Sequence, residues 1–279
     1  MRISICHYSF HREIGAGRMD LPAYFRTVKS LGLDACDLHM RLAGDVAANL
    51  ETIRSGLAEN GLTLSSYSLS DDFTQKDEAA RREQVETVKK GLRNARLLGT
   101  PTARVFGGHA SGADKASLAS DLKVIADSLK ECAGVAEEVK VTLALENHGG
   151  MPGLGEEVLE VIRKVGSQYL KACCDIGNFM GAGQTPEDGT RIVAPVTAYV
   201  HVKDNAYVDG KEPHGRATRA HKGVTVGDGV VPLEKCLKIL KDAAYDGFVA
   251  LEYEGEEEEH TGVKRSLEAL RKALKAVGV

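Results

Sequence analysis

Four ionisable side chains in the second half of the sequence stand directly behind short apolar runs. They are Glu146, Asp175, His201 and Glu252, and the runs are 141–145, 170–174, 198–200 and 248–251. Two glutamates, an aspartate and a histidine form a ligand set that suits Mn²⁺, Mg²⁺ or Co²⁺, and Zn²⁺ would bind as well. Without a cation, three carboxylates in a dry pocket would repel one another. We therefore expect one divalent metal ion, with Mn²⁺ as the first candidate.

Strand alternation adds further candidates two residues after these positions. Side chains at i and i+2 share one face of a strand, so His148 would accompany the first of the four residues and Lys203 the third. We expect these two to contact substrate or to transfer a proton. Glu254 competes with Glu252 as a ligand, and we prefer Glu252 because it directly ends its apolar run.

The elements that must position these residues are short apolar runs bounded by Gly, Asp or Asn. Runs of this length and composition are typical of buried parallel strands. We predict eight strands, at 3–8, 35–38, 62–69, 102–106, 141–145, 170–174, 198–202 and 248–251.

Amphipathic segments lie between the predicted strands. Their apolar residues recur every three or four positions, which predicts helices at 21–31, 45–60, 77–98, 117–139, 155–165, 233–243 and 263–277. Strand–helix alternation implies a parallel sheet with right-handed crossovers. Eight units in 279 residues indicate a single (β/α)₈ TIM barrel that forms one domain over residues 1–279. The alternative, an open doubly wound sheet, would more usually carry a glycine-rich fingerprint after its first strand, and only Gly15 and Gly17 occur there.

The composition excludes several classes of protein. Hydrophobic residues make up 43% of the chain and charged residues 27%, which is typical of a globular protein and not of a disordered one. The net charge of −4 gives no global attraction to nucleic acid or to an anionic membrane. The sequence has no stretch of about 20 apolar residues that would predict a membrane span. The six cysteines form no C-x-x-C pair and the first residues do not read as a secretory signal, so we expect a cytoplasmic protein with reduced thiols.

One long connection, 205–228, follows the seventh predicted strand and has no clear hydrophobic period. It carries basic side chains, and two interpretations stay open. It could form a lid over an anionic or polyhydroxyl substrate, or it could be a solvated basic loop.

Five segments resemble the sugar phosphate isomerase/epimerase superfamily, the xylose isomerase-like TIM barrels. They are LALENHGG (143–150), CCDIGNFM (173–180), YVHVKDN (199–205), VGDGVVP (226–232) and DGFVALEYEG (246–255). The resemblance implies that Glu146, Asp175, His201 and Glu252 are metal ligands. In the ketose 3-epimerase branch, the two glutamates also serve as the acid/base pair. Further candidates for substrate contact are Lys203, His7, His109 and Asn178, the last at a position that often holds histidine in that branch.

These residues predict an enzyme that removes a proton next to a metal-bound carbonyl. Our leading hypothesis is an isomerase or epimerase acting on a small-molecule sugar or sugar derivative. The alternative is a lyase or dehydratase acting on a keto-sugar, keto-glycoside or cyclitol, with His148 as its base. Endonuclease-IV-like DNA repair is disfavoured by the charge and by the single histidine of YVHVKDN. A non-catalytic binding protein is disfavoured by the intact ligand set, and the resemblance allows a homo-oligomer.

Overall fold

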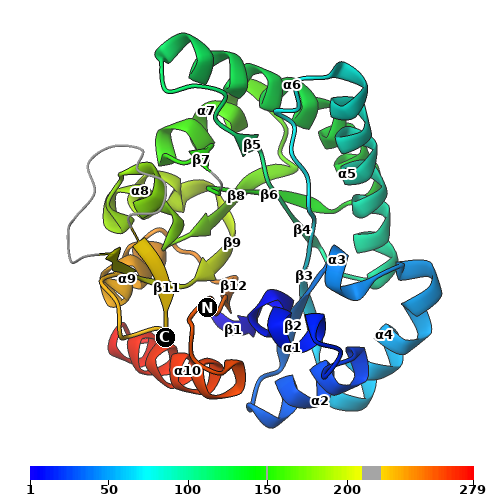
Figure 1. Ribbon diagram of the computed structural model, residues 1–279, viewed down its shortest axis with the longest axis vertical. Coiled ribbons are helices and arrows are strands. Elements are labelled where there is room, and N and C mark those ends of the chain that lie inside the picture. The colour runs from blue at the N-terminus through cyan, green and yellow to red at the C-terminus, as the bar shows by residue number, and fades with distance from the viewer. Residues whose placement is uncertain (149, 209–220) are drawn as a thin grey trace.

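Eight parallel strands form a nearly closed barrel in the computed structural model, which describes residues 1–148, 150–208 and 221–279 (Figure 1). The order of strands around the sheet is β1-β12-β9-β8-β6-β4-β3-β2. In chain order they are β1 (Arg2–Ile5), β2 (Ala35–His39), β3 (Thr63–Ser68), β4 (Thr102–Val105), β6 (Thr142–Glu146), β8 (Leu170–Asp175), β9 (Thr197–Val202) and β12 (Phe248–Leu251). The predicted TIM barrel is therefore confirmed, and the open doubly wound sheet is excluded.

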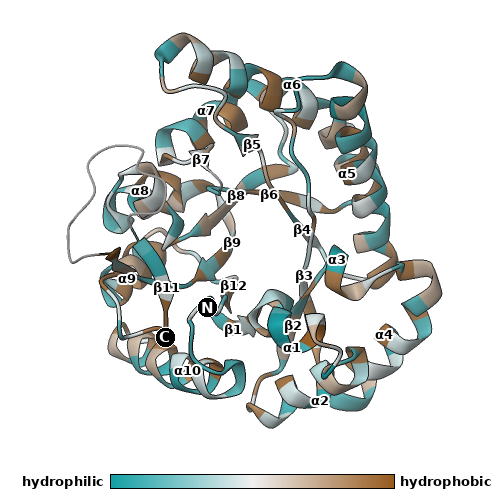
Figure 2. Cartoon of the chain, in the orientation of Figure 1, coloured by the Kyte–Doolittle hydropathy of each residue, from teal (hydrophilic) through white to brown (hydrophobic). Residues whose placement is uncertain are grey.

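Helices follow each barrel strand and surround the sheet (Figure 1). They are α2 (Leu21–Ser30), α4 (Val46–Asn60), α5 (Glu78–Leu98), α6 (Lys115–Val139), α7 (Gly155–Val165), α8 (Pro186–Val193), α9 (Leu233–Asp242) and α10 (Glu259–Ala276). Figure 2 shows apolar and polar residues mixed along these helices, as expected where one face packs on a sheet. Within the described residues, no helix is both long and apolar enough to cross a membrane.

Shorter elements decorate the barrel. They are the helices α1 (His11–Gly15) and α3 (Met40–Ala43), the 3₁₀ turns η1 (His7–Phe10), η2 (Asn178–Ala182) and η3 (Ala194–Val196), and the strands β5 (Gly108–His109), β7 (Gly150–Met151), β10 (Asp204–Tyr207) and β11 (His221–Val224). Two antiparallel pairs arise from these strands, β5 with β7 and β10 with β11.

The local sequence explains where the predicted helices begin and end. Asp45 is the N-cap of α4, because its side chain accepts a hydrogen bond from the Ala48 N–H at 2.9 Å. Gly61 ends the same helix in the left-handed conformation, with φ of 60°, where a Cβ would be strained. All seven predicted helices correspond to a helix of the barrel.

Three sequence predictions need correction. Helix α8 was not predicted, although Thr185 caps it and Pro186 begins it, because eight residues give too short a period to recognise. The first strand ends at Ile5 rather than at residue 8, since His7–Phe10 turns into η1. The long connection after β9 is not aperiodic throughout, because its ends pair as β10 and β11. Its middle, 209–220, lies outside the described residues, so both interpretations of that segment stay open.

The seam between β1 and β2 closes the barrel largely through side chains. These strands are the two ends of the strand order, and they lie side by side. The buried hydroxyl of Tyr24 lies 3.3 Å from the Ile5 carbonyl oxygen and 3.1 Å from the Asp37 carbonyl oxygen. The backbone N–H of His7 donates to the Asp37 carboxylate. Helix α2 therefore brings a polar group that ties the first strand to the second.

Replacing Tyr24 with phenylalanine should lower the free energy of unfolding by about 1 kcal/mol, because buried carbonyl oxygens of the seam lose their donor. Urea unfolding followed by circular dichroism measures the change. Tyr169→Phe, at a partly buried tyrosine outside the seam, is the control and should change stability by less than about 0.5 kcal/mol. Equal stability of Tyr24→Phe and the wild type would remove the seam role of the hydroxyl.

Candidate metal centre

Four strand ends bring Glu146, Asp175, His201 and Glu252 together inside one end of the barrel. Asp175 on β8 is in register with His201 on β9, and Ala250, two residues before Glu252, is in register with the same histidine. One ligand atom from each of the four lies within 4.8 Å of all the others. All four residues are buried. The structure thus gathers the four predicted ligands at the carboxyl ends of the strands, where TIM barrels place their active sites.

The imidazole of His201 is at the centre of this cluster. Its Nδ1 atom lies 3.6 Å from Oε1 of Glu146, 3.5 Å from Oε2 of Glu252 and 3.9 Å from Oδ2 of Asp175. Among the described residues, neither ring nitrogen of His201 forms a hydrogen bond. Oε2 of Glu252, Oδ2 of Asp175 and Oε2 of Glu146 form none either, although each is ion-paired with a buried cation, Lys203 or Arg104. Buried polar atoms that lack partners are costly. A divalent cation would satisfy them, so the donor set fits a metal ion of the Mn²⁺, Mg²⁺, Co²⁺ or Zn²⁺ type.

The pKa values of the cluster reflect its burial and its charged neighbours. Burial alone would raise the pKa of Glu146. Arg104 and His201 together outweigh burial and lower the pKa below its usual value, to about 2. Burial raises the pKa of Asp175 to about 8, although Lys203 opposes the change. Burial would lower the pKa of His201, but the acidic groups around it, Glu146 and Glu252 among them, hold it well above its usual value. The raised pKa values of Asp175 and His201 both show that this pocket favours positive charge.

Lys203 lies at the mouth of the barrel beside the cluster, as strand alternation predicts. Its side chain is only 3% exposed, and its Nζ atom lies 2.6 Å from Oε2 of Glu252 and 3.1 Å from Oδ2 of Asp175. A third carboxylate, that of Glu254, lies 3.3 Å from the same atom but is 34% exposed. Glu252 joins the four-residue group and Glu254 does not.

The other predicted contact residues are placed differently. His148 is half-buried with its ring centroid 4.2 Å from that of Phe106, and burial lowers its pKa to about 4, so its imidazole is neutral at pH 7. Asn178 donates from Nδ2 to Oε1 of Glu146 at 3.1 Å, so it contacts a candidate ligand. His109 is exposed and lies outside the four-residue group.

His7 is buried in the β1–β2 seam. Its ring centroid lies 4.3 Å from that of Tyr24, and its Nδ1 atom accepts a hydrogen bond from the His39 N–H at 3.4 Å. Burial, and secondarily His39, lower the pKa of His7 to about 3. The contacts of His7 therefore serve the closure of the barrel, and its predicted contact with substrate stays a prediction.

Arg104 is the functional candidate that the sequence analysis did not identify. It lies on β4 with 3% of its side chain exposed, and its Nε atom is 3.0 Å from Oε2 of Glu146. The signal in the sequence is a charged residue in the middle of a short apolar strand, which is rarely tolerated unless the charge is paired.

Asp204 has a different role from the cluster. Its buried carboxylate accepts hydrogen bonds from the backbone N–H groups of Asn205, Gly227, Gly229 and Val231, at 2.8 to 3.0 Å. It thereby holds the loop that follows β11. Among the described residues, every candidate metal-ligating group includes His201, so these groups overlap in one candidate cation site.

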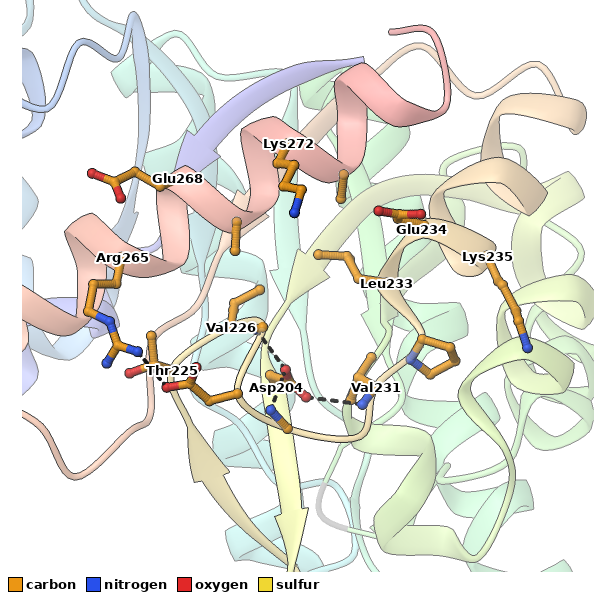
Figure 3. A pocket seen from close by; sticks show the side chains of 16 residues that line it. Asp204, Thr225, Val226, Val231, Leu233, Glu234, Lys235, Arg265, Glu268 and Lys272 are labelled. Atoms are coloured by element: carbon orange, nitrogen blue, oxygen red, sulfur yellow. Dashed lines mark hydrogen bonds and ion pairs between the residues drawn. The ribbon is translucent and has the colours of Figure 1, made fainter.

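A cavity of about 700 Å³ lies outside the barrel, between that loop, the start of α9 and α10 (Figure 3). Apolar side chains such as Val226 and Leu233 line it together with charged ones such as Arg265 and Lys272. None of the four cluster residues lines this cavity, so we do not assign the chemistry to it.

The fold is that of a TIM barrel, and the cluster occupies the position of a TIM-barrel active site. The chain belongs to the xylose isomerase-like TIM barrel family, whose model matches residues 25–273. Among curated relatives, it is 24% identical over 235 residues to L-ribulose-5-phosphate 3-epimerase UlaE of Salmonella paratyphi A, an alignment that covers 80% of this chain and 78% of the relative.

Solved structures share the fold at low sequence identity. The apo form of the 3-keto-D-glucoside 4-epimerase YcjR from E. coli matches with a TM-score of 0.77 and 17% identity, over 98% of this chain and 99% of that one. The IOLI protein, solved with a zinc atom bound, matches with a TM-score of 0.77 and 16% identity, over 99% of this chain and 98% of that one.

Adding Mn²⁺ should raise the unfolding temperature of the metal-free protein, because a ligand that binds only the folded state stabilises it. At a concentration of about 100 times Kd the gain is about 2.7 kcal/mol. Asp175→Asn, which removes a cluster carboxylate, should lose most of this shift in differential scanning fluorimetry. Asp246→Asn, at an exposed aspartate outside the cluster, is the matched control. An equal shift in all three proteins would place the bound ion elsewhere.

Proposed function

We propose that this protein is a divalent-metal-dependent epimerase or isomerase of a sugar or sugar derivative. The observation that carries the proposal is the convergence of four ligand atoms, from two glutamates, an aspartate and a histidine, within 4.8 Å of one another. The epimerase names of UlaE and YcjR support the same class of reaction and of substrate. Mn²⁺ is the first candidate for the metal, and the zinc atom in the IOLI structure keeps Zn²⁺ among the alternatives.

The residues of the cluster divide the work of such a reaction. Glu146, Asp175, His201 and Glu252 would hold the cation, which when bound would polarise a substrate carbonyl and acidify the neighbouring C–H bond. One glutamate would accept the proton and the other would return one from the opposite face, which inverts the carbon. Lys203 is within hydrogen-bonding distance of Glu252 and would stabilise negative charge there. Return of the proton to the adjacent carbon would give aldose–ketose isomerisation instead.

A lyase or dehydratase is the second candidate. The neutral imidazole of His148 favours it, since this side chain lies two residues beyond Glu146 and could accept the proton while a substituent leaves the next carbon. The two reactions share their first step and differ in the mass of the product.

The proposal extends to the setting of the enzyme. All six cysteines are free and buried, which suits the reducing cytoplasm that we propose as its location. We also propose that the chain forms one domain, acts on a small-molecule carbohydrate and can assemble as a homo-oligomer.

Incubation with ketoses, keto-glycosides and inositols in D₂O, with Mn²⁺ present, tests the reaction. An epimerase or isomerase should place one deuterium on carbon without any loss of mass from the substrate skeleton, as read by mass spectrometry and NMR. Loss of water or of an aglycone would instead establish the lyase. Absence of both outcomes across the panel, with metal bound, would contradict the proposed chemistry.

Glu146→Gln and Glu252→Gln should each slow deuterium incorporation by at least about 100-fold, because each removes both a cation ligand and a proton-transfer group. Glu268→Gln, at an exposed glutamate on α10, is the matched control and should retain the wild-type rate. Full activity in either cluster variant would remove the acid/base role of that glutamate.

A further inference from the structure

Arg104 is a permanently charged side chain buried in the barrel, beside the four-residue cluster but not one of its ligand residues. It lies on β4 between Ala103 and Val105, both of which are fully buried in the hydrophobic core. Its own side chain is 3% exposed. A guanidinium cannot shed its charge by deprotonation in a protein, so its burial must be compensated by its contacts.

Three contacts fix the guanidinium from three directions. Its Nη1 atom donates to the Leu69 carbonyl oxygen at 2.8 Å, at the end of β3. Its Cζ atom lies 3.8 Å from the ring centroid of Phe106, which directly follows β4. Its Nε atom lies 3.0 Å from Oε2 of Glu146, an ion pair in which neither atom forms a hydrogen bond among the described residues. A planar, forked group can make such contacts at once, whereas a single ammonium cannot.

The two oxygens of Glu146 therefore have different surroundings. Oε1 accepts the hydrogen bond from Asn178 and lies 3.6 Å from Nδ1 of His201, so it faces the cluster. Oε2 lies against Arg104 instead. Rotation of the carboxylate to bring both oxygens onto a cation would separate Oε2 from the guanidinium in a buried site, which is costly.

We propose that Arg104 is a positioning residue for the cation site, which holds Oε2 of Glu146 so that this glutamate binds a divalent ion through Oε1 alone. The inference rests on the proposed function, since it assumes that the cluster binds a metal. The Arg104 guanidinium would then stand next to a second positive charge, the divalent ion. By Coulomb's law alone, Arg104 would weaken cation binding, so its contribution must come from geometry.

Co²⁺ is the probe that tests this inference, because its visible absorption reports the number and arrangement of its ligands. We expect Arg104→Met to change the absorption spectrum of the Co²⁺ complex and to raise the Kd for Co²⁺ about tenfold or more, as is typical when a group that orients a metal ligand is lost. Arg104→Lys keeps a positive charge but cannot replace the fork, so its spectrum should change as well. Arg265→Met is the control, since Arg265 pairs with Asp228 and Glu257, outside the cluster.

The experiment distinguishes failure of the positioning role of Arg104 from failure of the metal site itself. Unchanged spectra with unchanged or tighter Co²⁺ binding in the Arg104 variants would show that the guanidinium does not position Glu146, while the metal site would stand. Failure of the wild type to bind Co²⁺ would overturn both. Far-ultraviolet circular dichroism of each metal-free variant checks the fold, and if Arg104→Met does not fold, the Arg104→Lys spectrum decides alone.

Discussion

The repulsion among three carboxylates inside a dry barrel is the constraint on which the rest of the site depends. Glu146, Asp175 and Glu252 are all buried, and each stands within 4 Å of the same imidazole nitrogen. Isolated buried charges of this kind cost several kcal/mol each. The chain offsets the cost with two buried cations, Arg104 against Glu146 and Lys203 against Glu252. The pKa values of Asp175 and His201 are both raised, so the pocket favours further positive charge. A divalent ion is the remaining element that would complete this balance.

The barrel meets the constraint because its strands fix side chains at defined heights. Lys203 directly follows β9, two residues after His201, so the end of this strand brings an imidazole and an ammonium to the same cluster. The seam between β1 and β2 also contributes, because it closes the barrel. There Tyr24 and the carboxylate of Asp37 join the first strand to the second, and the ring of closed strands keeps the four ends facing one another.

Much of this arrangement could be predicted from the sequence, for physical reasons. A glutamate or aspartate that directly follows an apolar run must stand at the edge of a packed core. The strand ends and the cluster could therefore both be predicted from the sequence. Arg104 was not predicted, because attention to strand ends overlooks a charge within a strand, and its partner is distant in sequence. Helix α8 was missed because it is short and contains Gly189. The β10–β11 pair was missed because its two strands of four residues each are separated by a long segment. His7 lies near the end of the first predicted run, 3–8, but β1 ends at Ile5 and His7 begins η1, which carries it into the seam.

Anomalous diffraction at the manganese absorption edge, from crystals of the protein grown with Mn²⁺, shows whether the four cluster residues hold the ion. We expect one strong anomalous peak bounded by Glu146, Asp175, His201 and Glu252, with a single oxygen of Glu146 in contact with the ion. A structure with Mn²⁺ in the solution but no peak within this cluster, or with its only peak at another place such as the outer cavity beside α10, would contradict this expectation.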